Sequence, residues 1–241
     1  MSEFLKSVQE NAAFLGVCLL TFIALFVIAW LAERFLLRQK SGVSKARYIS
    51  YVAMFSALAA VLMLFEIPLF FAPSFYELDL SELPVLICTF LLGPVAGVVT
   101  EFLKVVIKLV LKGTSTAFVG DFANFVVGCA LILPASIVYH FRRTRKSALV
   151  GMIVGTVILT AFGSLFNAVY LLPRFAALYG MPLDAIIGLG TQVNPAINSV
   201  STLVLFAVVP FNLLKGIVVS LLTFLLYKRI ARLLKHGIQK V

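Results

Sequence analysis

Charged side chains are scarce in this sequence. Asp, Glu, Lys and Arg together make up 12% of its 241 residues, whereas soluble domains usually carry about 25%. Hydrophobic residues make up 62% of the chain, and the mean hydropathy is +1.09. Because so few polar side chains cannot cover a water-soluble globule of this size, the composition indicates a protein that lies mostly within a lipid bilayer.

The motifs of several enzyme classes are also absent. No G-x-x-x-x-G-K-[ST] loop occurs, which excludes ATP hydrolysis by that route, and neither H-E-x-x-H nor G-x-S-x-G is present. Cys18, Cys88 and Cys129 lie in apolar runs without C-x-x-C spacing or a nearby His, which argues against a disulfide or a metal site. We therefore expect that the protein is neither an enzyme nor a metalloprotein and that it has no catalytic residues.

The charge that is present gathers in three basic clusters at the ends of apolar segments, a pattern that marks the cytoplasmic side of a polytopic membrane protein. The clusters are Arg34, Arg38, Lys40, Lys45 and Arg47; Arg142, Arg143, Arg145 and Lys146; and Lys228, Arg229, Arg232, Lys235 and Lys240. This sorting by membrane side explains the net charge of +10 without a nucleic-acid partner. We expect the clusters to contact anionic lipid headgroups as well.

The apolar segments predict an all-α polytopic protein of the plasma membrane. Residues 1–46 would hold one extra N-terminal transmembrane helix and a basic cytoplasmic linker, and residues 47–241 a six-helix unit. An odd number of crossings then puts the N-terminus outside and the C-terminus in the cytoplasm, with every basic cluster on the cytoplasmic side.

The individual helices are placed by apolarity. The predicted spans are residues 12–32, 48–65, 122–141, 148–172 and 202–227, with two short helices within 83–112. The two short helices meet at Gly93-Pro94, since proline removes a backbone donor and clashes with the preceding turn. Residues 66–82 and the long irregular stretch 173–201 are expected to lie outside.

Polar groups within a membrane are costly and mark candidate functional sites. Asn212 and Lys215 are three residues apart in the last helix and share a face, just after Pro210. An amide offers donors and an acceptor, which suits the imide edge of a heterocycle. Asn167 would face the same cavity from the preceding helix. The alternative is that both amides tie helices together while Lys215 extends to the membrane surface.

Other polar groups are assigned less specifically. Glu101, Lys104 and Lys108 share a helix face, and their pairing would be structural unless they line a cavity. Thr116 or Asp121 would cap the helix that follows, and Thr116 is also a candidate ligand residue. Asn124 lies deeper and is a further ligand candidate.

The outer loop mixes aromatic, acidic and apolar residues. We expect Tyr76, Leu78 and Asp79 to close over a pocket, where acidic groups would bind polyol hydroxyls. Alternatively, this loop lies in the membrane interface as an aromatic anchor.

Two pairs of small residues predict helix faces that allow close contact between helices. The pairs are Ala53-x-x-x-Ala57 (followed by Ala60) and Gly151-x-x-x-Gly155.

From about residue 47 to 235 the chain resembles the substrate-binding subunits (S components) of energy-coupling factor (ECF) transporters, and more narrowly the riboflavin-specific members. Four stretches carry the resemblance: Leu78-Asp79-Leu80-Ser81-Glu82-Leu83-Pro84; Leu92-Gly93-Pro94-Val95-Ala96-Gly97; Gly113-Thr114-Ser115-Thr116 with Ala123-Asn124-Phe125; and Val209-Pro210-Phe211-Asn212-Leu213-Leu214-Lys215-Gly216. The last is the most specific, whereas the others are shared by S components for several vitamins. The extra N-terminal helix departs from the family pattern.

The resemblance implies a six-helix S-component bundle that captures a vitamin from outside, with riboflavin as the transported ligand and no cofactor. Asn167, Asn212 and Lys215 would match flavin-ring contacts, and the loop from Tyr76 to Asp79 would match a lid. Ala53 and Ala57 would meet the transmembrane coupling subunit, and two ATPase subunits would supply the energy. Two alternatives stay open: an S component for a different vitamin, and a membrane scaffold protein without a small ligand.

Overall fold

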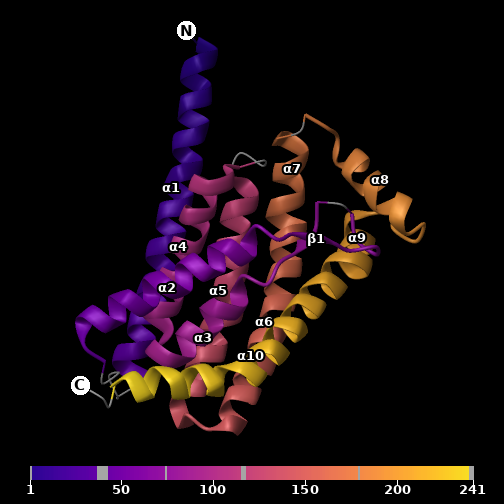
Figure 1. Cartoon of the computed structure of the whole chain (residues 1–241). Helices are drawn as coiled ribbons and strands as arrows, with labels where there is room; N and C mark the ends of the chain where they lie inside the picture. Colours follow the sequence, from indigo (N-terminus) through magenta and orange to yellow (C-terminus); the bar gives the residue numbers. More distant parts are fainter. Residues whose placement is uncertain (1, 37–42, 74, 115–117, 179, 239–241) are drawn as a thin grey trace.

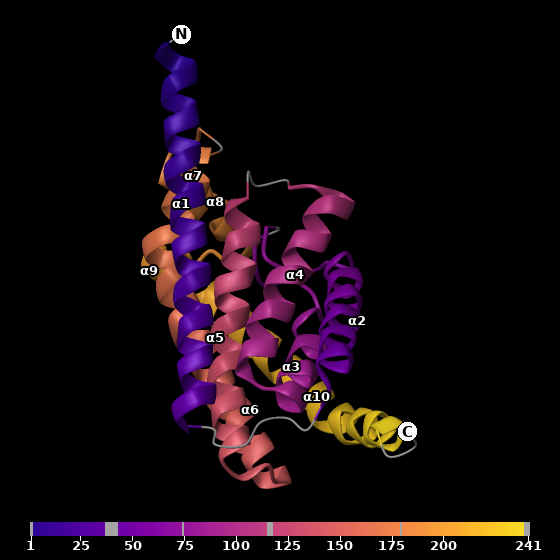
Figure 2. The same ribbon diagram turned by 90° about the vertical axis from the view of Figure 1, so that its left-hand side faces the viewer.

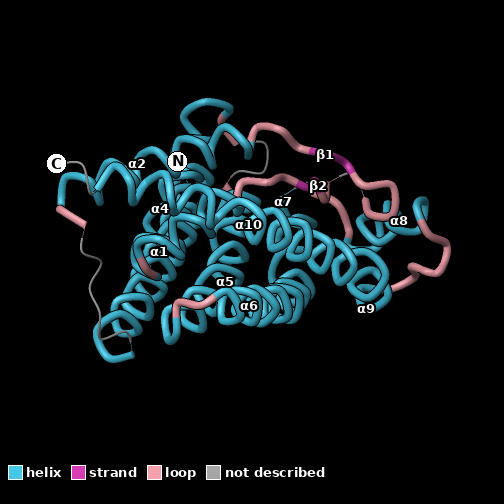
Figure 3. Tube along the Cα trace, turned by 60° about the horizontal axis from the view of Figure 1, so that its bottom comes forward, coloured by secondary structure: helices cyan, strands magenta, loops and turns pink. Residues whose placement is uncertain are grey.

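The computed structural model describes residues 2–36, 43–73, 75–114, 118–178 and 180–238. Figure 1 shows a molecule built almost entirely of helices, which confirms the predicted all-α class. In the described part of the chain, strands are confined to a two-residue antiparallel pair, as Figure 3 shows. Five helical segments are long and apolar enough to cross a membrane: Gly16–Phe35, Lys45–Met63, Val119–Arg142, Arg145–Ala177 and Val200–Ile230.

The first helix packs along the outside of the bundle. Helix α1 (Ser2–Leu31) begins before the predicted span and continues into the π-helical turn η1 (Ala32–Leu36). Figure 2 shows α1 running beside α5, with its N-terminal part extending beyond the bundle. Its Phe22 ring lies 4.4 Å from the Phe102 ring, centroid to centroid, and Ala29 is fully buried.

Helix α2 (Lys45–Met63) has one buried and one exposed face. Val52 and Phe55 are buried, whereas Ala53 and Ala57 are exposed. Ala60 is buried, so the prediction that it extends the smooth face of Ala53 and Ala57 is wrong. After α2, strand β1 (Ile67–Pro68) pairs with β2 (Glu77–Leu78).

The predicted break at Gly93-Pro94 is confirmed. Helix α3 (Glu82–Leu92) ends there and α4 (Pro94–Lys112) begins. Gly93 has φ of +114°, a conformation that L residues other than glycine rarely adopt. Since α3 is only about 16 Å long, it cannot cross a bilayer alone.

Helices α5 (Val119–Arg142) and α6 (Arg145–Phe166) approach each other closely. A Cβ atom at Gly151 or Gly155 would lie 2.5 Å from the backbone oxygen of Ala135 or Leu131, respectively. The expectation that this glycine pair permits close helix contact is therefore confirmed.

The predicted irregular stretch 173–201 is wrong. Helix α6 continues through the π-helical turn η2 (Asn167–Leu171) into α7 (Leu172–Leu178), and α8 (Leu183–Val193) follows. The last helix also contains a π-helical turn: α9 (Val200–Leu203), η3 (Val204–Val208) and α10 (Val209–Ile238) are continuous. The turns η2 and η3 each end two residues before a proline, Pro173 or Pro210, whose ring would clash with a regular preceding turn.

The chain runs up and down through the bundle, so the described residues of the three basic clusters gather at one end. Figure 1 shows the ends of α1, α5 and α10 and the starts of α2 and α6 at the lower end, with the N-terminus at the upper end. Lys45, Arg142, Arg145 and Lys228 belong to these lower ends. Arg38, Lys40 and Lys240 lie outside the described residues.

Candidate functional site

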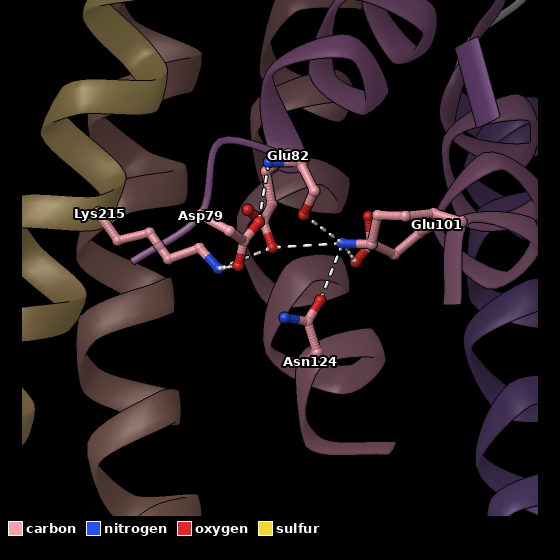
Figure 4. Close-up of polar contacts among 7 residues, drawn as sticks. Asp79, Glu82, Glu101, Asn124 and Lys215 are labelled. Carbon is pink, nitrogen blue, oxygen red and sulfur yellow. Dashed lines mark hydrogen bonds and ion pairs between the residues drawn. The ribbon is translucent and has the colours of Figure 1, made fainter. Parts of the chain in front are cut away.

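A buried lysine at the middle of the bundle is paired with two carboxylates. The Nζ atom of Lys215 on α10 lies 3.0 Å from Asp79 Oδ2 and 3.0 Å from Glu82 Oε1. Figure 4 shows the Lys215 side chain reaching from α10 toward these two acids. Two acids of the chain itself therefore compensate this ammonium group. Its positive charge therefore holds the loop before α3 against α10.

Asp79 anchors the end of that loop. Its Oδ1 atom accepts a hydrogen bond of 2.8 Å from the backbone N–H of Ser81. Burial by itself would raise the pKa of the Asp79 carboxyl group, but Lys215, Lys104 and the Ser81 hydrogen bonds together hold that pKa below its usual value. Asp79 is therefore ionised at neutral pH and pairs with Lys215 as a carboxylate.

A second buried lysine extends the network to α4 and α5. Lys104 is fully buried, and its Nζ atom donates to Glu101 at 2.5 Å, to Asn124 Oδ1 at 2.9 Å and to Ser81 Oγ at 3.1 Å. It also lies 3.3 Å from Glu82 Oε1. The expected pairing of Glu101 with Lys104 is confirmed, and these groups connect three helices.

The third lysine of this face makes a separate pair. The Nζ atom of Lys108 donates to Asp121 Oδ1 at 2.7 Å. Of the two residues expected to cap α5, Asp121 is paired with Lys108 instead, and Thr116 lies outside the described residues. At the start of α5, Thr114 Oγ1 accepts a hydrogen bond of 2.9 Å from the backbone N–H of Phe118.

Asn212 presents an amide without a partner. Its side chain is 3% exposed, and its Nδ2 atom has no hydrogen-bond partner among the described residues. A Cβ atom at Gly163 would lie 2.9 Å from Asn212 Nδ2, so glycine leaves room for this amide. A buried donor without a partner costs about 1–3 kcal/mol, which favours a ligand acceptor here.

Asn167 is linked to the outer loop. The Tyr76 hydroxyl group donates to Asn167 Oδ1 at 2.7 Å, and Asn167 Nδ2 donates to the backbone oxygen of Gly163 at 2.8 Å. The Tyr76 ring also packs against Phe75 and Phe211, with centroid distances of 4.6 and 5.5 Å. The loop is thus fastened to the π-helical turn that carries Asn167.

These groups surround a cavity of about 150 Å³ between the loop, α3, α5, α6 and α10. Its wall combines aromatic and aliphatic side chains with amides, two carboxylates and one ammonium group. The lining residues are Phe75, Tyr76, Glu77, Glu82, Gly120, Ala123, Asn124, Val127, Gly128, Leu131, Leu159, Asn167, Leu171, Phe175, Phe211, Asn212 and Lys215. Such a wall suits a flat, largely apolar ligand with several hydrogen-bonding groups.

Five of the predicted ligand residues line this cavity: Tyr76, Asn124, Asn167, Asn212 and Lys215. Two others, Leu78 and Asp79, lie behind it. Leu78 is buried in the same apolar cluster as Tyr76, and Asp79 pairs with Lys215. Thr116 lies outside the described residues.

The sequence analysis missed the role of Glu82. Its Oε2 atom is buried with no hydrogen-bond partner in the described structure, and the residue lines the cavity. A signal was present in the sequence, since Glu82 is a carboxylate at the first position of an apolar helix, three residues after Asp79. Its distance of 133 residues along the chain from Lys215 concealed the pairing.

Comparisons with known proteins agree with this geometry. The family profile described as "ECF transporter, substrate-specific component" matches residues 47–227. The chain is 34% identical to the riboflavin transporter RibU of Staphylococcus aureus (strain TCH60) over 199 residues, which are 83% of this chain and 98% of RibU. It is 29% identical to the riboflavin transporter FmnP of Bacillus subtilis (strain 168), covering 76% of this chain and 91% of FmnP.

A solved structure of an S component also matches this chain. The S component of a bacterial ECF transporter superposes with a TM-score of 0.62 and 32% sequence identity, covering 80% of this chain and 99% of that one. The family profile begins at residue 47, so α1 and η1 lie outside the matched region.

Proposed function

The chain belongs to the family of ECF transporter substrate-specific components, and from that membership we propose that it is the riboflavin-binding subunit of a vitamin importer in the plasma membrane. One observation on the present chain supports this function. The buried Nδ2 atom of Asn212 has no hydrogen-bond partner in the described structure, and Asn212 lines a cavity that also contains aromatic side chains and other amides. The protein is a transport subunit and not an enzyme.

The chemistry of the wall fits the flavin ring. Its apolar residues, such as Leu131, Leu159 and Phe211, would bury the ring, and Asn212 would pair with the alternating donors and acceptors of its imide edge. Asn124 and Asn167 offer further amides. In this proposal Lys215 contacts the ligand while it remains paired with Asp79 and Glu82.

The outer loop would act as a lid. The cavity of about 150 Å³ is smaller than the roughly 300–1,000 Å³ of typical ligand pockets. Entry of a flavin therefore requires the Tyr76 ring to move away from Asn167, which breaks one hydrogen bond. Since the loop lies opposite the basic end of the bundle, substrate would enter from the extracellular side, with the C-terminus in the cytoplasm.

Energy would come from other subunits. The chain works with a transmembrane coupling subunit and two ATPase subunits, as its family membership implies. We propose that Ala53 and Ala57 on the exposed face of α2 form the contact with the coupling subunit, because small side chains let helices approach closely.

A ligand panel tests the function. Riboflavin, thiamine and pantothenate would each be titrated against the purified protein while its thermal stability is measured, since a ligand stabilises by RT ln(1 + [L]/Kd). We expect riboflavin alone to raise the melting temperature strongly. A larger shift with another vitamin would identify an S component of different specificity, and no shift with any ligand would favour a scaffold role.

A further inference from the structure

Helix α8 presents different faces around its circumference, and one of them packs against the bundle. Ile186, Ile187 and Gly190 are buried and form this inner face. A Cβ atom at Gly190 would lie 2.7 Å from Leu203 Cδ1, so glycine allows α8 to approach α9 closely. The position of α8 on the bundle is therefore fixed by packing, and the rest of its circumference is exposed.

The exposed circumference divides into an apolar and a polar flank. Ala185, Leu189 and Val193 are exposed at a spacing of four residues and form the apolar flank. Asp184 and Gln192 are exposed one residue before Ala185 and Val193, on a polar flank that is rotated by about 100°. Leu189 and Val193 are 37% and 38% exposed. Apolar and polar exposed faces on one helix are typical of a position between lipid and water.

The place of α8 in the chain puts it beside the outer surface of the membrane. It lies between the segments Arg145–Ala177 and Val200–Ile230, which are both long and apolar enough to cross a bilayer. Figure 1 shows α8 in the upper half of the molecule, projecting sideways from the bundle and away from the basic end. Its 11 residues give a helix of about 16 Å, which is too short to cross a bilayer.

A neighbouring turn carries another exposed apolar side chain. Figures 1 and 3 show the turn between β1 and β2 near α8, and Ala72 of this turn is buried in the same apolar cluster as Ile186 and Ile187. Phe70 in this turn is 92% exposed, and its ring centroid lies 5.5 Å from that of Phe71. An exposed phenyl ring is unfavourable in water but stable at the boundary of headgroups and acyl chains.

The charge and surroundings of α8 favour lipid as the partner of its apolar flank. Asp184 is the sole charged residue of α8, so the helix offers little charge to a protein partner. Helix α9, against which α8 packs, continues into η3, where Leu205 and Phe206 are 57% and 41% exposed within a membrane-spanning segment. Lipid that covers these two side chains lies next to α8 as well.

We propose that α8 is an interfacial helix of the outer leaflet. Its apolar flank, Ala185, Leu189 and Val193, contacts lipid at the boundary of headgroups and acyl chains, while Asp184 and Gln192 face water. Because α8 carries a single charge, the contact depends on burial of apolar surface and needs no anionic lipid. The proposal concerns the membrane and is independent of the ligand that the cavity binds.

Site-specific fluorescence tests the proposal. Trp30 is the sole tryptophan of the sequence, so Trp30→Phe provides a full-length protein without tryptophan. In this background, Leu189→Trp and its matched control Gln192→Trp place one indole ring on each flank of the same helix. Both variants would be reconstituted in phosphatidylcholine brominated near the headgroup end of its acyl chains. We expect the brominated lipid to quench Leu189→Trp at least about twofold more strongly than Gln192→Trp.

Acrylamide, a quencher dissolved in water, supplies the opposite measurement. It should quench Gln192→Trp at least about twofold more strongly than Leu189→Trp, because the polar flank faces water. Val193→Trp, on the apolar flank, should behave like Leu189→Trp and repeats the measurement at a second position. Equal melting temperatures of the variants verify that the fold is unchanged.

Two results would overturn the proposal. Equal quenching of Leu189→Trp and Gln192→Trp by each reagent would mean that the two flanks share one environment. Protection of Leu189→Trp from acrylamide without quenching by brominated lipid would indicate that protein, and not lipid, covers the apolar flank. Neither result bears on riboflavin binding, which the ligand panel tests separately.

Discussion

Two residues that line the cavity each carry a buried polar atom without a partner. These atoms are Asn212 Nδ2 and Glu82 Oε2, and neither has a hydrogen-bond partner in the described residues. One is a donor and the other an acceptor, so a ligand with both kinds of group satisfies the pair. The neighbouring ion pairs fix the positions of these atoms.

Asn212→Leu should weaken riboflavin binding by about tenfold to hundredfold, because it removes hydrogen bonds worth about 1–3 kcal/mol in a buried site. Thr223→Val is the matched control: Thr223 is also on α10, fully buried and without a side-chain partner in the described structure, but it does not line the cavity. Titration of both variants with riboflavin, followed by flavin fluorescence, measures their affinities. Equal riboflavin affinities of the two variants would contradict the role of Asn212.

Lys215→Met should destabilise the protein by about 3–5 kcal/mol, because it leaves Asp79 buried without its ion-pair partner and Glu82 with Lys104 alone. The double variant Lys215→Met with Asp79→Asn should recover part of this loss, since the unpaired charge of Asp79 is gone. Thermal unfolding in detergent measures the difference. A fully stable Lys215→Met protein would show that these ion pairs do not hold the loop.

Sequence patterns located the polar residues of the last helix but not their partners. Asn212 and Lys215 stand out because each interrupts an apolar run. The acids that neutralise Lys215 lie more than 130 residues earlier, and only the fold brings them within 3.0 Å. The hydrogen bond between Tyr76 and Asn167 was equally beyond sequence patterns, since it joins a loop to a π-helical turn.

At the scale of elements, the extra helix is fastened to the bundle by a side-chain cap. Glu33 Oε1 in η1 accepts a hydrogen bond of 2.9 Å from the backbone N–H of Val95, in the first turn of α4. A carboxylate at a helix N-terminus satisfies an otherwise free donor and interacts favourably with the helix dipole. Gly93 leaves room for this group, because a Cβ atom there would clash with Glu33.

Glu33→Ala should lower the free energy of unfolding by about 0.5–2 kcal/mol, the usual cost of losing a helix N-cap. It should also increase hydrogen exchange at the first turn of α4. Asp184→Ala, which removes an exposed carboxylate from α8, serves as the control. Unchanged exchange at Val95 would mean that η1 does not cap α4.

Helix positions followed from apolarity, whereas the irregular features did not. The break at Gly93-Pro94 was predictable because both residues are unfavourable within a helix. Helix α8 was missed because its surroundings are rich in glycine and proline, and α7 was missed because η2 accommodates Pro173. A π-helical turn changes the hydrogen bonds from i→i+4 to i→i+5, and no apolar pattern at the sequence level identified these turns.

At the scale of the whole molecule, the extra helix lies on the opposite side of the bundle from the face proposed to contact the coupling subunit. Figure 2 shows α1 on one side and α2 on the other. Helix α1 therefore does not cover the exposed face of α2 that carries Ala53 and Ala57. An added helix is thus compatible with docking of a coupling subunit at α2.

Ala57→Trp should abolish riboflavin uptake in cells that contain the coupling and ATPase subunits, because a large ring prevents close helix approach. Riboflavin binding to the purified variant should stay within about twofold of wild type, since Ala57 lies outside the cavity. The control Ala161→Trp places the same ring on the exposed side of α6. Uptake by Ala57→Trp at the wild-type rate would rule out α2 as the docking face.

The most direct measurement is the absorption spectrum of the protein purified from cells, with mass spectrometry of the small molecule released on unfolding. A flavin spectrum and the mass of riboflavin, in a ratio approaching one per chain, are predicted. A different released vitamin, or a colourless protein that also fails to quench added riboflavin, would contradict the assignment of the Asn212 cavity as a flavin site.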